Sequence, residues 1–502
     1  MPLAKVNSAA VVGLDAYPVE VEVDISNGLP SFQIVGLPDK AIEESKERVR
    51  AAIKNSGANF PMKRITVNLA PADIKKEGPA YDLAIAVGIL VADEQLPVLD
   101  EGILMVGELA LNGKLRHVSG ILPIVISLNK KFTEIILPKI NTDEACLVQD
   151  FKILPVETLK DLIFHFKNEM ILPYAKNIIK FEPRVDYEND LAFVKGQEQA
   201  KRALEIAAAG GHNVLFNGPP GSGKTLLART IPSILPQLNK DEILEVTKIY
   251  SVAGLLSADR PIIFERPFRA PHHTVSSVAL VGGGTYPKPG EITLSHRGVL
   301  FMDEFAEFPR SVLEALRQPL EDGIITVSRA QGSISYPAKF ILVAAQNPCP
   351  CGYLGDTKKN CICSPVQIMR YQKRVSGPLL DRIDIHIEVP RVEYEKLSSD
   401  SVAESSESVR ARVETARKLQ YKRFKKTNSE MSPRETKKYC VLDEAGKDLL
   451  KLAMNQYDLS ARQYTRILKV ARTIADLAGC ENIGTEHIGE ALQYRPKEKH
   501  AY

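Results

Sequence analysis

The chain has 502 residues, of which 44% are hydrophobic and 25% charged, and its formal net charge is +3. This length exceeds what one hydrophobic core supports, so we expect roughly two to four domains, and the composition excludes collagen-like and wholly disordered proteins. The longest apolar run, residues 83–92, has about half of the ~20 residues that a membrane span needs, and the N-terminal residues lack the pattern of a signal peptide. We therefore expect a cytoplasmic protein with no membrane partner, in which affinity for nucleic acid would have to come from local basic patches.

The first part of the chain is predicted to form one α/β domain over residues 1–170. Short β-branched runs at residues 19–25, 31–36, 65–70 and 133–138 indicate strands, whereas residues 39–56 and 79–92 have helical patterns. Residues 171–192 contain two prolines and mixed charge without a sustained period, which indicates a linker.

A second α/β domain is expected over residues 193–392. Its strand candidates are residues 213–217, 298–302 and 340–345, and helices are expected after Gly223 and over residues 311–321. A Ser-rich acidic stretch follows at residues 398–407. The helical patterns at residues 409–426 and 461–477 then predict a helical C-terminal domain over residues 393–502, so the fold class is a multi-domain α/β protein.

A glycine-rich loop follows the first strand of the second domain and has the spacing G-x-x-x-x-G-K-[ST] of a phosphate-binding loop. It consists of Gly218, Pro219, Pro220, Gly221, Ser222, Gly223, Lys224 and Thr225. Glycines allow backbone N–H groups and the helix N-terminus to face phosphate oxygens, Lys224 adds positive charge, and Thr225 can ligate Mg²⁺. The loop therefore predicts an ATP site with Mg²⁺ as cofactor.

Polar side chains follow the other two predicted strands of this domain. Asp303 and Glu304 come directly after one strand, and Asn347 follows the next. Because ligands of open α/β sheets bind at the carboxyl ends of the strands, we expect Asp303 to hold Mg²⁺ and Glu304 to activate the attacking water. Asn347 would orient that water. The acidic pair alone would also fit an ordinary strand end.

The chain resembles the AAA+ ATPases, in particular their magnesium-chelatase-like branch and the ComM/YifB group within it. Five motifs carry the resemblance in the family's order: GHNVLFNGPPGSGKT, PHHTVSSVALVGGG, GVLFMDEFAEF, NPCPCGY and SGPLLDRIDIHIEVP. It covers essentially the whole chain. It implies an N-terminal Lon-protease-like domain, a central AAA+ P-loop ATPase core and a C-terminal helical lid.

The resemblance also implies an arginine finger. Arg382 matches the arginine that reaches the nucleotide of the neighbouring subunit, and the alternative is an ordinary salt bridge to Asp381 or Asp384. Since a finger supplied from a neighbour needs an assembly, the resemblance implies a homo-hexameric ring.

Two further nucleotide contacts follow from the resemblance. An arginine of the helical lid contacts the nucleotide in cis, and Arg462 matches it, with Arg466 as the second choice. Gly196 and Gln197 resemble the segment that borders the adenine.

The phosphate loop and the acidic pair are separated by more chain than one helix and one strand require. Residues 268–291 contain three consecutive glycines and three prolines, which is typical of a mobile loop. Residues 324–329 and 333–336 predict a β-hairpin. The resemblance implies that the first segment is a helix-2 insertion and that both elements point into the ring's channel, where nucleic acid passes. Arg329 would contact phosphate there, and the alternative is a solvated charge.

The N-terminal domain resembles the Lon-type protease domain in two segments, KEGPA and GELALNGKLRHVSGILPI. That enzyme needs a Ser nucleophile and a Lys base. Ala80 occupies the Ser position and Leu122 the approximate Lys position, so we expect the fold without proteolysis. Lys114 and Ser119 lie nearby in sequence and would be the alternative dyad.

Four cysteines lie close together in sequence: Cys349, Cys351, Cys361 and Cys363. Four thiolates are the number that a tetrahedral Zn²⁺ site takes, although C-x-C spacing is less usual than C-x-x-C. The cluster predicts a zinc site, and the alternative is four reduced thiols in a loop.

Residues 416–426 combine six positive charges with two aromatic residues. Such a helix can bind phosphates and stack bases, whereas the plainer interpretation is a solvated face with packed aromatics.

Taken with the resemblance, these features predict an ATP-driven ring motor on DNA. The implied activity is a hexameric helicase that promotes branch migration when incoming single strands recombine during natural transformation. Its partners would be single-stranded and branched DNA, with a recombinase as a further candidate. The alternatives are a chelatase-type motor that remodels a protein partner, an ATP-gated DNA clamp without translocation, and a vestigial protease.

Overall fold

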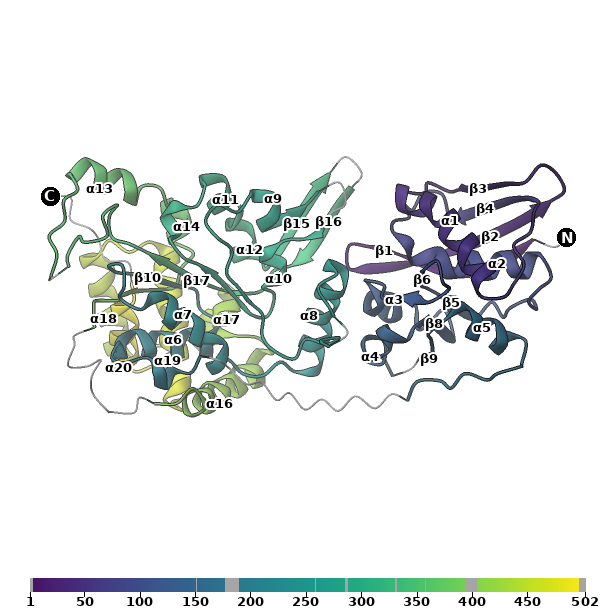
Figure 1. Ribbon diagram of the computed structural model, residues 1–502. Helices are drawn as coiled ribbons and strands as arrows, with labels where there is room; N and C mark the ends of the chain where they lie inside the picture. Colours follow the sequence, from purple (N-terminus) through teal and green to yellow (C-terminus); the bar gives the residue numbers. More distant parts are fainter. Residues whose placement is uncertain are drawn as a thin grey trace. The chain divides into compact units, whose positions relative to one another are not determined.

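The computed structural model describes residues 3–149, 151–176, 189–257, 259–284, 288–329, 332–356, 358–392 and 404–495. The chain forms two compact units (Figure 1), the first from Met1–Glu182 with Lys240–Ile263 and the second from Pro183–Asn239 with Phe264–Tyr502. Among the described residues, no helix has the length and apolar character that a bilayer crossing requires.

The first unit is built on a seven-stranded mixed sheet with the order β3-β4-β2-β1-β5-β8-β9. Its strands are β1 (Ala4–Val12), β2 (Asp15–Ser26), β3 (Ser31–Val35), β4 (Arg64–Ala70), β5 (Ile103–Met105), β8 (Glu134–Pro138) and β9 (Lys152–Val156), with the small pair β6 (Glu108–Leu109) and β7 (Leu115–Arg116). Its helices include α1 (Lys40–Asn55), α2 (Asp82–Ala92), α3 (Ile121–Leu128), α4 (Thr142–Ala145) and α5 (Leu159–Phe166). The four predicted strands and two predicted helices are confirmed. Alternate residues of β2 and β4 are buried, and α2 is buried along its whole length because it packs on β1 and β2.

Helix α8 (Lys240–Ala253) also belongs to the first unit, although its sequence lies between the phosphate loop and the acidic pair. It packs on α3. The Ser251 hydroxyl donates to the buried carboxylate of Glu144 and accepts the Gly120 N–H at 3.0 Å. Glu144 also accepts the Leu122 N–H at 2.8 Å. The compact units therefore differ from the expected boundaries, which placed residues 240–263 inside the ATPase core.

Replacing Ser251 by Ala should loosen α8, because the change leaves the Gly120 N–H without its acceptor and Glu144 without one donor. We expect a loss of about 1–3 kcal/mol in local stability. Hydrogen exchange of the full chain should show faster exchange in α8, whereas Ser26→Ala, at the exposed end of β2, should not. Equal exchange in the two variants would mean that apolar contacts alone hold α8.

The second unit contains a five-stranded sheet with the order β11-β14-β17-β10-β18. Its strands are β10 (Val214–Asn217), β11 (Phe268–Arg269), β14 (Val299–Met302), β17 (Ile341–Gln346) and β18 (Ile385–Glu388), and its helices include α6 (Glu198–Gly210), α7 (Lys224–Ile234), α11 (Arg310–Ala315), α12 (Arg317–Asp322), α13 (Pro365–Gln372) and α14 (Gly377–Leu380). All strand pairs are parallel, so the carboxyl ends meet at one edge. The predicted strands are confirmed, and the predicted helix at residues 311–321 is two short helices.

The predicted insertion contains short elements in place of the expected loop. They are α9 (Ser277–Val281), β12 (Gly282–Gly283), β13 (Lys288–Pro289) and α10 (Glu291–Leu294). Arg269 pairs with Glu291 through two contacts of 2.6 and 2.7 Å, which joins the two ends of this segment. The predicted hairpin is confirmed as β15 (Ile324–Arg329) and β16 (Gly332–Pro337). The side chain of Arg329 lies outside the described part of the structure.

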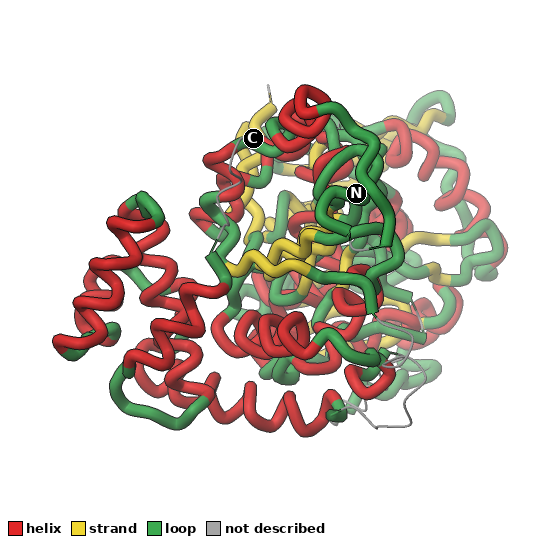
Figure 2. The backbone as a smooth tube through the Cα atoms, turned by 90° about the vertical axis from the view of Figure 1, so that its left-hand side faces the viewer, coloured by secondary structure: helices red, strands yellow, loops and turns green. Residues whose placement is uncertain are grey.

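The C-terminal part of the second unit is helical (Figure 2). Its helices are α16 (Ser406–Phe424), α17 (Pro433–Tyr439), α18 (Glu444–Gln456), α19 (Ala461–Leu477) and α20 (Thr485–Gln493). Helices α16 and α19 pack on α6. On the basic stretch of α16, Arg417 donates to the Ala208 carbonyl at 2.7 Å and Arg423 pairs with Asp476 at 2.9 Å. Phe424 packs against the core, so this stretch supports the plainer, structural interpretation.

Candidate nucleotide-binding site

The phosphate loop, residues 218–225, follows β10, which lies between β17 and β18 in the sheet, and its last two residues begin α7. Gly223 has φ +89°, in the left-handed region that favours glycine. A Cβ on Gly218 would lie 2.2 Å from the Val389 carbonyl oxygen, so the loop passes the end of β18 too closely for a side chain. The local sequence therefore folds as the spacing predicts.

Lys224 is buried in this loop and is held by neutral oxygens. Its Nζ donates to the carbonyls of Gly218 (2.7 Å) and Pro219 (2.8 Å) and lies 3.3 Å from the Asn347 side-chain oxygen. Burial lowers the pKa of Lys224 to about 8, against the opposing effect of Asp303. An anion such as a phosphate would stabilise the charged ammonium better than these carbonyls do.

Thr225 and Asp303 meet as expected of magnesium ligands. The Thr225 hydroxyl donates to Asp303 Oδ2 at 2.7 Å. Mg²⁺ prefers hard oxygen ligands and keeps several waters, so one hydroxyl and one carboxylate beside a phosphate loop fit this ion.

Glu304 has a strained backbone and a partner that sequence reasoning missed. Its φ is +52°, which is uncommon for a residue other than glycine and often marks functional sites. His273 Nδ1 lies 2.9 Å from Glu304 Oε2, and the His273 ring lies beside that of His272, with centroids 4.1 Å apart. The motif PHHTVSS carried the resemblance, but no local spacing pointed to a contact with Glu304.

Replacing His273 by Ala should raise the rate of ATP hydrolysis measured without DNA, because Glu304 loses a partner that competes with water for its carboxylate. For a partly exposed pair worth about 1 kcal/mol we expect about a 5-fold increase. His272→Ala is the matched control, since His272 bonds Thr274 and not Glu304. A lower rate in His273→Ala alone would show that His273 orients Glu304 for hydrolysis.

The predicted adenine segment lies against the phosphate loop. The Gln197 side-chain amide donates to the Ser222 carbonyl at 3.2 Å and to the Pro390 carbonyl at 2.6 Å. Gly196 and Gln197 both have positive φ, so the chain turns sharply here before α6 begins. Gln197 therefore lies beside the phosphate loop, and its position next to the adenine stays a prediction.

Arg382 and Arg462 share one carboxylate. Arg382 donates to Glu321 and to the Pro378 carbonyl (2.7 Å), and Arg462 Nη2 lies 3.6 Å from the other Glu321 oxygen. The expected salt-bridge alternative therefore named the wrong partners, because Asp381 and Asp384 are not those of Arg382. The described contacts do not join Arg382 or Arg462 to the phosphate loop.

Arg466 has a separate partner, Asp384, at 3.2 Å. Burial alone would raise the pKa of Asp384, but Arg466 and the hydrogen bond to His212 lower it to about 2. This pairing gives Arg466 a structural role at the base of β18.

Comparisons with known proteins agree with this geometry. The family model described as magnesium chelatase, subunit ChlI, matches residues 190–397, and models of the ChlI subunit and its C-terminal part match residues 21–141 and 403–495. The competence protein ComM of Haemophilus influenzae is 46% identical over 99% of this chain and 98% of its own length. The uncharacterized protein YifB of Escherichia coli is 45% identical over 99% and 97%.

The chain belongs to the magnesium-chelatase-like ComM/YifB family. Its similarity to the chelatase subunit itself is partial. The magnesium-chelatase subunit ChlI of Olisthodiscus luteus is 27% identical over 31% of this chain and 49% of its own length.

The four cysteines of this ComM/YifB-family chain lie together in one loop after Asn347. Their sulfur atoms all lie within 4.8 Å of one another. Cys349, Cys351 and Cys361 have Sγ–Sγ distances of 3.4 to 3.6 Å, and the Cys351 N–H donates to Cys363 Sγ at 3.4 Å. With Zn–S bonds of about 2.3 Å, tetrahedral ligands lie about 3.8 Å apart, so these three distances fit zinc with a small expansion, and all four sulfur atoms lie within 4.8 Å of one another.

The cysteine loop also touches the nucleotide site. A Cβ on Gly352 would lie 2.6 Å from Pro220 Cδ and 3.7 Å from the Asn347 side-chain carbon. The loop therefore packs against both the phosphate loop and the end of β17.

The residues at the protease positions have no catalytic arrangement. Ala80 and Leu122 cannot act as nucleophile and base, and Leu122 is fully buried in α3. Burial lowers the pKa of Lys76, whose ammonium donates to the Pro71 carbonyl. No hydrogen bond joins Lys114 to Ser119 in the described part of the chain.

Proposed function

We propose that this protein hydrolyses ATP and uses the free energy to move DNA strands, as a hexameric ring that promotes branch migration during recombination of incoming single strands. The observation that carries the proposal is the convergence of Lys224, Thr225, Asp303 and Asn347 at one sheet edge, with Glu304 beside them. The word competence in the name of the Haemophilus influenzae relative supports DNA as the substrate.

Each of these residues would have a separate role in ATP hydrolysis. The phosphate loop and Lys224 would bind the phosphates, and Thr225 with Asp303 would hold Mg²⁺, which when bound neutralises charge on the β- and γ-phosphates. Glu304 would accept a proton from the attacking water, and Asn347 would orient that water. Gly196 and Gln197 would border the adenine.

The arginine pair supports an assembly of several copies. The described contacts of Arg382 and Arg462 are with Glu321 and not with their own phosphate loop. Arg462 is 57% exposed, whereas Arg382 is 12% exposed, so Arg382 would have to leave Glu321 to reach a neighbouring subunit. We propose that Arg382 acts there as the finger and that Arg462 accompanies it. This differs from the cis contact that the resemblance implies for Arg462.

DNA would pass through the ring's channel, along the β15–β16 hairpin and the insertion at residues 268–291. Arg329 ends β15 and remains the proposed phosphate contact. Such contacts are electrostatic, so strand binding should weaken steeply with salt. The proposal places the ring in the cytoplasm, with a recombinase as a candidate partner.

The experiment that tests the proposal measures ATP hydrolysis and the mass of the assembly with and without oligo(dT). Single strands should raise the rate and promote a ring, and the ring should then displace a paired strand from forked DNA. A rate that responds to no nucleic acid would contradict the proposal. Stimulation without strand displacement would favour an ATP-gated clamp.

The second candidate is a chelatase-type motor that remodels a protein partner, since the matched family model is that of a chelatase subunit. Against it stands the full-length similarity to ComM and YifB, compared with partial similarity to ChlI.

We further propose that Cys349, Cys351, Cys361 and Cys363 hold one Zn²⁺ that fixes the loop against the phosphate loop. Protein purified under reducing, chelator-free conditions should contain about one Zn²⁺ per chain. Cys361→Ser should lose the metal, whereas Cys480→Ser, at an exposed cysteine outside the cluster, should keep it. Near-zero zinc in the parental protein would support four reduced thiols.

A further inference from the structure

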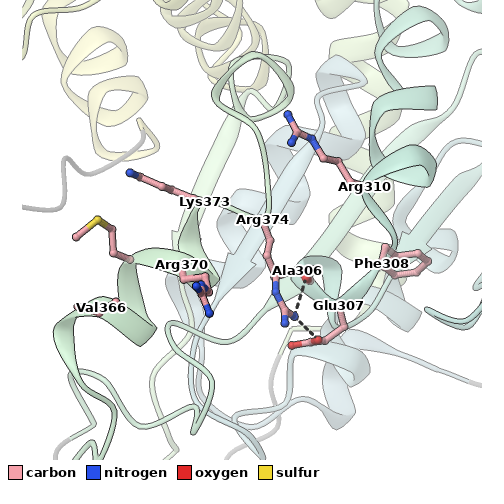
Figure 3. A pocket seen from close by; sticks show the side chains of 9 residues that line it. Ala306, Glu307, Phe308, Arg310, Val366, Arg370, Lys373 and Arg374 are labelled. Atoms are coloured by element: carbon pink, nitrogen blue, oxygen red, sulfur yellow. Dashed lines mark hydrogen bonds and ion pairs between the residues drawn. The ribbon is translucent and has the colours of Figure 1, made fainter.

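A basic pocket of about 670 Å³ lies beside η4 (Phe305–Glu307), the short helix that directly follows Glu304. Its lining includes Arg310 at the start of α11 and Arg370, Lys373 and Arg374 at the end of α13. In Figure 3, Arg310 lies on the other side of the pocket from Arg370 and Arg374, and Lys373 extends away from Glu307. This pocket contains no residue of the nucleotide site described above.

The positive charges that line the pocket outnumber the carboxylates that pair with them. Arg374 pairs with Glu307, which is the pocket's carboxylate. Among the described residues, Arg310, Arg370 and Lys373 have no carboxylate partner. The lining therefore has an excess of three positive charges.

Helix energetics account for Arg370 but not for the other cations of the pocket. Arg370 lies in the last turn of α13, where the helix dipole favours a cation. Lys373 and Arg374 follow at spacings of three and four residues, where like charges repel. Arg310 is the first residue of α11, where the dipole disfavours a cation. A bound anion would offset both the repulsion among the cations and the unfavourable dipole at Arg310.

The apolar residues of the lining indicate which kind of anion the pocket binds. Val366 and Met369 are 68% and 50% exposed, although both are apolar residues of α13, the helix that carries Arg370. A small inorganic anion would leave them in water. A nucleic-acid strand presents phosphates to the guanidinium groups and apolar sugar and base faces to Val366 and Met369.

We propose that this pocket binds the phosphodiester backbone of a single nucleic-acid strand. This inference rests on the proposed action on DNA, and it adds a contact outside the hairpin and the insertion. A phosphate in the pocket competes with Glu307 for Arg374. Glu307 belongs to η4, which directly follows Glu304. Displacement of Glu307 from Arg374 by a phosphate of the strand would therefore act within a few residues of the acidic pair.

The test compares two double variants, each of which removes two exposed positive charges. One pair lies at the end of α13 and the other on the exposed face of α16. Arg370→Gln with Lys373→Gln changes the pocket, and Lys418→Gln with Lys422→Gln changes the exposed face of α16. Binding of labelled oligo(dT) and oligo(rU) is measured by anisotropy between 50 and 200 mM salt, with ATP hydrolysis measured alongside. Arg310→Gln serves as a second pocket variant on a different element.

The pocket variants should bind oligo(dT) about 10-fold more weakly, with a salt slope smaller by about one to two, since each lost phosphate contact removes about 0.7 from the slope for single strands. Their DNA-free hydrolysis should equal that of the parent, and the α16 pair should bind as the parent does. Equal loss with oligo(rU) would extend the site to RNA.

Three results would overturn the inference. Parental binding by both pocket variants would exclude the pocket while leaving the proposed function intact. Equal weakening by the α16 pair would show that the loss of binding is not specific to the pocket. A parent that binds no single strand, but binds polyglutamate in a manner that depends on Arg370, would overturn both this inference and the proposed function in favour of an acidic protein partner.

Discussion

Replacing Glu304 by Gln should reduce ATP hydrolysis by about 10²- to 10⁴-fold, the contribution typical of a positioned general base. Gln keeps the size of the side chain and can still contact His273, but it cannot accept the proton of the attacking water. Lys224, Thr225 and Asp303 remain in place, so ATP should still bind.

Two measurements check this result together. Phosphate release should fall, while the affinity for a fluorescent ATP analogue should stay within about 2-fold of the parent, because no phosphate contact is lost. The variant should also accumulate as the ATP-bound ring. Normal turnover by Glu304→Gln would remove this residue from the mechanism, and loss of nucleotide binding would indicate a structural role for it.

Replacing Arg382 by Ala should reduce hydrolysis by about 10³-fold or more, as expected for a finger that stabilises the transition state. Nucleotide affinity should change little, because the described contacts of Arg382 are with Glu321 and Pro378 rather than with the phosphate loop. The control is Glu321→Gln, which releases the arginine without removing it and should retain most of the activity.

Mixed rings separate a contribution from the neighbour from a contribution within one subunit. Arg382→Ala and Glu304→Gln subunits are each inactive alone, but together they place an intact pocket next to an intact finger. Mixing them should restore part of the rate. The absence of recovery in rings shown to contain both subunits would mean that Arg382 acts in its own subunit or only in folding.

The same design decides the position of Arg462. If Arg462 accompanies the finger, mixtures of Arg462→Ala with Glu304→Gln should recover activity as the Arg382→Ala mixtures do. If Arg462 instead contacts the nucleotide of its own subunit, the mixtures should stay inactive. In that case the subunits with an intact Glu304 are the Arg462→Ala subunits, so each of their pockets lacks the Arg462 side chain.

The sequence predicts the local parts of the nucleotide site because their chemistry depends on short spacing. The phosphate loop, the strand that carries Asp303 and the strand before Asn347 each have their defining residues within a few positions. Parallel strands then bring the three ends to one edge of the sheet, as seen in the contacts of Lys224 and Thr225.

Contacts between segments that are distant in the sequence could not be predicted from such short patterns. His273 of the insertion contacts Glu304 at the end of β14, and no short sequence pattern specifies this contact. Glu321 is likewise shared by two arginines from separate elements. Apolar periodicity predicts that a helix has a buried face, but it does not say which neighbour covers that face. For this reason the sequence does not predict that α8 packs on α3.

The path of the chain through α8 limits how this protein can be divided. A fragment that begins at the start of the matched ATPase region, near residue 190, would still contain α8, because α8 lies between α7 and β11. The face of α8 that packs on α3 would then be exposed to water in the fragment. Dissection of the two units would therefore need a short polar linker in place of residues 240–263. For the same reason, loss of the N-terminal unit during evolution would require two deletions rather than one.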